Sequence, residues 1–181
     1  MNMLVAGKLS GIQDFIFDVK MEGGAQAKRL RARSFFVQVL TEVLYLRTAD
    51  FLEVEPKQAQ VFCGAGKFLL SGEARNVSRL NLLEREVNEK LLRDAAGRLS
   101  FSCAWFESEG AFKDSYERVM KRLSFRKKQP FKSVFSKGGD WDKKSLRLQS
   151  ITPPCDLCEQ EKAEKTEEGY GICKTCWMMR R

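Results

Sequence analysis

Four cysteines toward the end of the sequence have the residue type and spacing of a metal-binding site. Cys155 and Cys158 form one C-x2-C pair, and Cys173 and Cys176 form a second pair after fourteen intervening residues. Two such pairs let four thiolates converge tetrahedrally on one zinc ion. The alternative is a pair of reactive or disulfide-forming dithiols, which a cytoplasmic setting disfavours. The spacing therefore predicts a structural zinc site, since four thiolates leave no open coordination position.

The other residues that could do chemistry have simpler explanations. Cys63 and Cys103 lie inside strand-like patterns and are expected to be small core residues. Asp140 and Asp142 follow two glycines, as metal-binding carboxylates can, but no strand-like run flanks them, so a solvated turn is favoured. Histidine is absent, which excludes Ser-His-Asp and Cys-His nucleophiles and histidine-ligated nuclease centres.

Positive charge is concentrated in one stretch. The chain carries 32 Lys and Arg against 24 Asp and Glu, a net charge of +8, which favours polyanionic partners such as nucleotides or nucleic acid. Residues 121–137 hold seven basic side chains and no acid, with three phenylalanines between them. This stretch could grip RNA, or its phenylalanines could pack a helix while its lysines are solvated, and the residues leave both open. The candidate RNA-binding residues are Lys121, Arg122, Arg126, Lys127, Lys128 and Lys132.

A sharp turn follows the first apolar run. Residues 10–15 read SGIQDF, where a buried strand would be expected to lead into a helix. A strand that ends in Ser-Gly can present its following amides to phosphate oxygens. Gly11 could equally do no more than relieve a tight turn, and the residues alone favour this simpler explanation.

The first half of the chain predicts a strand, a helix and a hairpin. Residues 3–9 read as a strand. An amphipathic helix pattern then runs from about residue 24 to residue 51. Residues 58–73 predict two short strands joined by a turn at residues 64–66. The first turns of the helix are decorated by Arg29, Arg31 and Arg33.

A second helix and a last strand follow. Asn76 or Ser78 would cap the helix, and Gly97 would end it. Residues 99–105 alternate between large apolar and small or polar side chains, as a half-buried strand does. The element order predicts an α+β fold on the ferredoxin-like β-α-β-β-α-β plan, an antiparallel sheet with its helices on one face. The other face would be uncovered and lined by Ser100, Ser102 and Ala104.

The composition changes beyond this unit. We expect a ferredoxin-like domain over residues 1–110, a basic helix and linker over residues 111–150, and a zinc-knuckle segment over residues 151–181. The basic helix would cover residues 112–123. No apolar run approaches the roughly 18 residues that span a bilayer, and the first residues lack the layout of a signal peptide. We therefore expect a cytoplasmic protein without a membrane partner.

Four segments carry a resemblance to a known family. They are, in the family's order, SGIQDFIF (10–17), AQAKRLRARSFFVQVL (25–40), CGAGKFLL (63–70) and the two cysteine pairs. Together they resemble the Csm-type large subunit of type III CRISPR effector complexes, also called cyclic-oligoadenylate synthetase, over nearly the whole chain. The resemblance implies the first palm domain and the zinc-binding insert of that subunit. The nuclease domain and the second palm, with its Gly-Gly-Asp-Asp hairpin, have no counterpart in this sequence.

The resemblance also implies a role in antiviral defence. In the family, two ATP molecules bind with Mg or Mn between the two palms, and aspartates of the second palm hold the metals for cyclic oligoadenylate synthesis once target RNA is bound. This chain would supply a nucleotide-binding surface and no catalytic residue, so its status as an enzyme is left open. Its implied partners are the second palm or remainder of the subunit, other effector subunits, and guide or target RNA. The implied nucleotide-binding residues are Ser10, Gly11, Ile12, Gln13, Asp14, Gly64 and Gly66.

Two residues depart from the family pattern. Lys8 stands where the family usually has an acid, which argues against a metal at the end of the first strand, and Ala32 replaces the glycine of LRGRS. The chain would be a truncated gene product, half of a split subunit, or part of a longer protein. A second hypothesis is a stand-alone basic zinc-ribbon module that binds RNA or docks on an effector complex, with its palm serving as a scaffold.

Overall fold

The computed structural model describes most of the chain, and all structural statements below concern that part. It covers residues 2–17, 26–73, 77–95, 97–108, 110–136, 153–158, 162–167 and 169–178. The first elements in chain order are β1 (Asn2–Ser10), α1 (Ile12–Phe17), α2 (Gln26–Phe51), α3 (Pro56–Ala59), β2 (Gln60–Gly64) and β3 (Lys67–Glu73). The remaining elements are η1 (Val77–Arg79), α4 (Leu80–Asp94), β4 (Ser100–Glu107), α5 (Phe112–Lys127), α6 (Lys132–Phe135), β5 (Lys165–Glu167), β6 (Tyr170–Ile172) and α7 (Lys174–Met178).

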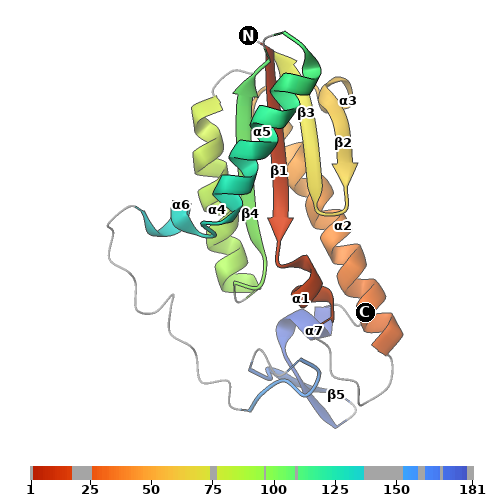
Figure 1. The fold of residues 1–181 in the computed structure, drawn as a ribbon. Coiled ribbons are helices and arrows are strands. Elements are labelled where there is room, and N and C mark those ends of the chain that lie inside the picture. Colours follow the sequence, from red (N-terminus) through yellow and green to blue (C-terminus); the bar gives the residue numbers. More distant parts are fainter. Residues whose placement is uncertain are drawn as a thin grey trace.

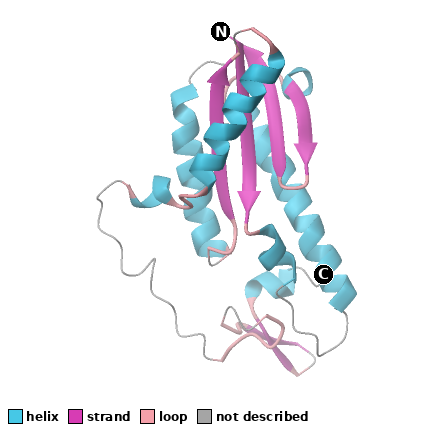
Figure 2. Cartoon of the chain, viewed as in Figure 1, coloured by secondary structure: helices cyan, strands magenta, loops and turns pink. Residues whose placement is uncertain are grey.

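Four strands form one antiparallel sheet, in the order β2-β3-β1-β4 (Figure 2). β1 pairs with β3 along one edge and with β4 along the other, so that Val5 lies opposite both Leu70 and Trp105. β2 and β3 form the expected hairpin, with a register shift between Gln60 and Phe62. This sheet with its helices confirms the expected combination of helices and an antiparallel sheet.

One face of the sheet is covered by α2 and α4, which lie side by side behind it in Figure 1. The core on this side joins alternate residues of the strands, such as Val5, Leu70 and Phe101, to the apolar stripes of the two helices. α2 contributes Leu44 and the buried Tyr45, whose hydroxyl donates to the carbonyl of Pro56. Within the described ranges, no helix combines the length and apolar character that crossing a membrane requires.

The other face of the sheet is covered by α5, which crosses in front of β1 and β4 (Figure 1). Val119 and Leu123, one helical turn apart, pack on Leu4, Ala6 and Ala104. The expectation of an uncovered face is therefore wrong. The reason is that α5 is mostly polar and charged, and two inward residues on successive turns are enough to seat it on small strand residues.

The N-terminal end of α4 differs from the expectation, and its C-terminal end agrees with it. A 3₁₀ turn, η1, precedes the helix, and its N-cap residue is Arg79, with no side-chain capping hydrogen bond, so Ser78 does not cap α4. The alternative cap, Asn76, lies outside the described residues. The expected stop at Gly97 is confirmed: its φ is 71°, and its amide donates to the carbonyl of Leu91 at 3.3 Å.

A close approach in the middle of β1 holds an aromatic cluster against the strand. A Cβ atom on Gly7 would lie 2.1 Å from Cζ of Phe68, which is well inside van der Waals contact. The Phe68 ring in turn stacks on Phe101, with ring centroids 6.1 Å apart, and meets Tyr45 edge-on at 5.8 Å. Gly7 is therefore required by packing.

We predict that Gly7→Ala lowers the free energy of unfolding by about 1–3 kcal/mol, the usual cost of overpacking a dense core. The matched control is Gly72→Ala in β3, where the added Cβ would make only ordinary contacts, the nearest being 3.6 Å from Val54. Urea unfolding of both variants measures the difference. Equal stability of the two variants would contradict the packing argument.

Candidate functional site

The four cysteines of the predicted zinc site come from two short segments that the backbone clamps together. Cys155 and Cys158 lie in a loop, whereas Cys173 and Cys176 lie at and just inside the start of α7. The amide of Asp156 donates to the carbonyl of Gly171 at 2.8 Å. The amide of Gly171 donates back to Oδ2 of Asp156 at 2.5 Å. These reciprocal bonds bring the β5–β6 hairpin, and with it the second pair, against the first pair.

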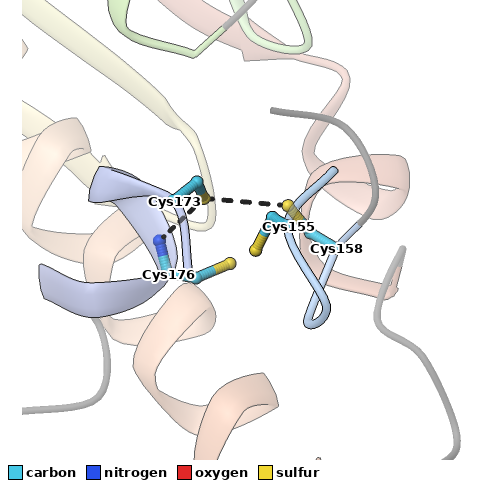
Figure 3. Close-up of side chains that lie close together, drawn as sticks. All are labelled: Cys155, Cys158, Cys173 and Cys176. Atoms are coloured by element: carbon cyan, nitrogen blue, oxygen red, sulfur yellow. Dashed lines mark hydrogen bonds between the residues drawn. The ribbon is translucent and has the colours of Figure 1, made fainter. Parts of the chain in front are cut away.

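All four sulfur atoms lie within 4.8 Å of one another, and all four side chains are buried (Figure 3). The Sγ atoms of Cys158 and Cys173 are 3.8 Å apart, and none of the four cysteines is in a disulfide. Tetrahedral coordination with Zn–S bonds of about 2.3 Å puts neighbouring sulfur atoms about 3.8 Å apart. The donor set and its spacing therefore fit a zinc ion held by four thiolates.

The close packing of the sulfur atoms governs their ionisation. Hydrogen bonds with the other thiols, first of all with Cys158, lower the pKa of Cys155. Hydrogen bonds with Cys155 raise the pKa of Cys173 and of Cys176 far above that of a free thiol. Four thiolates this close together repel one another, and a divalent cation at their centre is what allows all of them to be charged.

The predicted turn after the first strand is present, and packing accounts for its glycine. Gly11 has a φ of 83°, and a Cβ atom there would lie 1.9 Å from the carbonyl oxygen of Arg98. The short helix α1 starts at once, with the Phe15 amide donating to the Gly11 carbonyl at 2.9 Å. Gln13 and Asp14 are exposed on this helix. The structural explanation for Gly11 thus holds whether or not the turn also contacts a ligand.

The fold brings this turn and the β2–β3 hairpin tip together. The Leu9 amide donates to the carbonyl of Gly66 at 2.7 Å. A Cβ atom on Gly66, whose φ is 76°, would lie 2.1 Å from Cδ1 of Ile12. The hydroxyl oxygen of Ser10 is buried and has no hydrogen-bond partner in the described part of the chain. The two segments implied in nucleotide binding, residues 10–14 and 64–66, therefore form one continuous edge, called the nucleotide edge below.

Positive charge accumulates beside the nucleotide edge. Lys8 of β1 lies opposite Lys67 of β3 in the sheet register, and Lys127 of α5 reaches the same place. Burial, the hydrogen bond with Lys127 and the charges of Lys127 and Lys67 together lower the pKa of Lys8. We call Lys8, Lys67 and Lys127 the lysine cluster. Such a cluster attracts phosphate groups and repels divalent cations.

The six basic candidates for RNA binding divide into two groups. Arg126 pairs with the buried carboxylate of Glu84 at 3.0 Å and so ties α5 to α4, whereas Arg122 donates to the carbonyl of Trp105 at 2.8 Å and ties α5 to β4. The four lysines are exposed, and they are Lys121, Lys127, Lys128 and Lys132. Asp140 and Asp142, expected to form a solvated turn, lie outside the described residues.

The two remaining cysteines lie in the sheet, as expected. Cys103 is fully buried in the main core, and burial raises the pKa of its thiol. Cys63 is half-buried at the edge of the same core. Burial and the hydrogen bond that its thiol donates to Glu42 raise the pKa of Cys63 to about 12. Neither thiol is suited to act as a nucleophile at neutral pH.

One residue at the site was missed from the sequence. Arg33, expected to decorate the surface of its helix, is 2% exposed and points from α2 toward both α1 and the cysteines. The available signal was its position in the helix, one turn before Val37 on the buried stripe of α2.

Comparisons with known proteins place this geometry in a family. A family model described as "Csm1 subunit domain B" matches residues 1–139. A relative from Methanocaldococcus jannaschii, "CRISPR system single-strand-specific deoxyribonuclease Cas10/Csm1 (subtype III-A)", is 29% identical over 183 aligned residues. That match covers 93% of this chain and 22% of the relative, so the chain spans under a quarter of the relative's length.

Solved structures agree with this match. A Csm1–Csm4 cassette in complex with cA4 superposes with a TM-score of 0.63 at 25% identity, covering 74% of this chain and 20% of that chain. A Csm1–Csm4 cassette in complex with one ATP gives a TM-score of 0.61 at 26% identity, covering 75% and 20%. Because the family model covers more than half of the sequence, the chain belongs to the Csm1 subunit domain B family of type III CRISPR large subunits (Cas10/Csm1).

Proposed function

We propose that this chain is a first palm that forms one side of an ATP-binding cleft in a type III CRISPR large subunit, with no catalytic residue of its own. The observation that carries the proposal is the nucleotide edge, in which the end of β1, α1 and the hairpin tip are packed together. The strand order β2-β3-β1-β4 supports the ferredoxin-like palm plan. The similar Csm1–Csm4 cassettes solved in complex with cA4 and with one ATP support nucleotide as the ligand class.

In this proposal the remaining half of the cleft comes from a second palm. Its aspartates would hold the Mg or Mn ions for cyclic oligoadenylate synthesis, while residues 10–14 and 64–66 of this chain contact the nucleotide. The lysine cluster supports a polyanionic ligand at this edge. Relatives solved as Csm1–Csm4 cassettes support a second effector subunit as partner, in the cytoplasm where CRISPR effector complexes act.

We also propose that zinc occupies the four-cysteine centre and that it is structural. Cys155, Cys158, Cys173 and Cys176 would hold it, and the ion would supply charge to neutralise the thiolates and fasten two chain segments. The three-part division at residues 110 and 150 is kept as a proposal, with the qualification that α5 packs on the sheet of the first part.

A second candidate function rests on the outer side of α5. Phe125 is 63% exposed there, and exposed lysines lie nearby in the sequence. Exposed aromatic and cationic side chains together are typical of surfaces that bind single-stranded nucleic acid. The alternative is thus a basic zinc-ribbon module that binds RNA or docks on an effector complex, without a role in nucleotide chemistry.

We predict that ATP binds when the chain is mixed with a separately produced second palm, and not to the chain alone. Ser10→Trp should weaken this binding at least about tenfold, or about 1.4 kcal/mol, because a bulky side chain fills the turn. Calorimetric titration measures the affinity, with Ser78→Trp in the distant η1 turn as the control.

Two outcomes of the same titrations would contradict the first proposal. One is an RNA affinity that changes neither on addition of the second palm nor in Ser10→Trp, together with no ATP binding in any mixture. That result supports the RNA-binding alternative. The other is conversion of ATP into oligonucleotides by the purified chain alone, because catalytic carboxylates would then have to lie within it.

We predict that Lys8→Gln stabilises the protein at about pH 7. Because the folded-state pKa of Lys8 is lowered, keeping this lysine charged costs folding free energy at neutral pH. That cost fades as the pH rises through the folded-state pKa toward the ordinary value of 10.5, so the two proteins should converge there. Urea unfolding across this pH range tests whether Lys8→Gln raises the free energy of unfolding, with Lys90→Gln at an exposed lysine as the control. A Lys8→Gln variant less stable than wild type would contradict it.

We predict one zinc ion per chain, lost in Cys176→Ser and retained in Cys63→Ser. Removing the ion with a chelator should lower the thermal midpoint of wild type and of Cys63→Ser, because binding free energy becomes folding free energy. The same chelator should leave the midpoint of Cys176→Ser unchanged. Elemental analysis and thermal scans provide the measurements, and an equal loss of zinc in both variants would count against the assigned ligands.

A further inference from the structure

A buried arginine links the cysteine centre to the nucleotide edge. Arg33 lies on α2 and is 2% exposed. Its Nη1 donates to the backbone carbonyl of Phe15 at 2.8 Å, and its Nη2 lies 3.9 Å from Sγ of Cys176, within hydrogen-bonding range of a sulfur acceptor. One planar guanidinium therefore touches two parts of the chain that are far apart in sequence: α1 and the second cysteine pair.

The guanidinium is charged at any physiological pH, and burying it is costly unless negative charge lies nearby. Phe15 offers a carbonyl dipole and the face of its ring, whose centroid lies 5.6 Å from Cζ of Arg33. Cys176 offers a sulfur atom that is a weak acceptor as a thiol and a strong one as a thiolate. Four thiolates around one Zn²⁺ carry a net charge of −2, so the loaded centre places negative charge directly beside the buried Arg33.

Phe15 connects Arg33 to the nucleotide edge. Its side chain is 1% exposed, and its ring is flanked by Arg33 and, at 5.4 Å, by Cζ of Arg98. The Phe15 amide donates to the Gly11 carbonyl, and the carbonyl oxygen of Arg98 leaves no room for a side chain at Gly11. The residue that Arg33 holds is therefore one turn of helix from the Ser10-Gly11 turn.

We infer that Arg33 is a positioning residue that couples the metal–thiolate centre to α1, so that loading of the centre stabilises the conformation of the nucleotide edge. This inference rests on the zinc proposed above and gives that ion a second effect beyond fastening its own segment. The expected consequences run both ways, because coupling between two sites is reciprocal. Replacing Arg33 should weaken metal binding, and removing the metal should destabilise α1.

The first test measures the metal. Zinc release from the purified protein to a chromogenic chelator should be about tenfold faster or more in Arg33→Met, because replacing a residue that supports a metal ligand typically costs about 10–100-fold in metal affinity. Arg33→Lys should fall between Arg33→Met and wild type, since it keeps the charge and loses the planar fork. The matched control is Arg31→Met, an exposed arginine two residues earlier on the same helix.

The second test measures the stability of α1, and its first comparison uses wild-type protein alone. Hydrogen exchange of the Phe15 amide should be faster in chelator-treated wild type than in the zinc-loaded protein. Arg33→Met should raise this exchange rate even with zinc present, and combining it with Cys176→Ser should add little, because both changes break the same link. Amides of α4 serve as the internal reference for global unfolding.

The outcomes separate this inference from the metal proposal. Zinc-loaded protein whose release rate and Phe15 exchange are the same in wild type and Arg33→Met would overturn the coupling and leave the zinc site standing. Wild-type protein that binds no zinc would overturn both. If Arg33→Met does not fold, chelation of wild type decides alone: unchanged exchange at Phe15 overturns the coupling, and selectively faster exchange supports it.

Discussion

The central strand β1 is the constraint on which the other parts depend. It is paired along both edges, and its residues alternate between two cores, one under α2 and α4 and one under α5. A strand that is paired along both edges and packed on both faces has a fixed path. The position and direction of its last residues are therefore fixed as well. Gly11 turns there against the Arg98 carbonyl, and the Leu9 amide holds the hairpin tip at Gly66. The path of the backbone into the nucleotide edge is thus set by strand pairing.

Much of the sheet could be predicted from the sequence because its signals are local. The alternation over residues 99–105 reflects the two faces of β4, and the Gly-Ala-Gly turn reflects the positive φ angles at Ala65 and Gly66. The four-cysteine centre was predictable for the same reason, since each pair is a local motif. The packing of α5 on the second face of the sheet could not be predicted from a local pattern. A helix was expected over residues 112–123, but no local pattern shows which surface it covers, whereas in the structure Val119 and Leu123 pack on the small facing residues Ala6 and Ala104.

Arg33 illustrates a second limit of prediction from sequence, which concerns buried charged residues. A charged residue in a helix is normally solvated, and its neighbours Arg29 and Arg31 offered the same interpretation. The burial of Arg33 brings three elements into contact: α2, the carbonyl of Phe15 in α1 and the cysteine segment. The periodicity of α2 places Arg33 on the buried stripe, but it does not identify the groups that Arg33 contacts, because Phe15 and Cys176 are 18 and 143 residues away in the chain. Buried charges are in general set by tertiary partners, and they are therefore the residues that a sequence describes least well.

The electrostatics of the edge bear on how two palms would divide their work. Metal-dependent phosphodiester synthesis needs carboxylates close enough together to hold divalent cations. In this chain Lys8 lies two residues before the end of β1, and Lys67 and Lys127 add positive charge beside it. A cation placed there would be repelled by three ammonium groups, whereas the oxygens of a triphosphate would be attracted. Under the proposed function, the charges that would attract a nucleotide to this edge also make it a poor metal site, so the carboxylates for phosphodiester synthesis would have to come from an acidic partner.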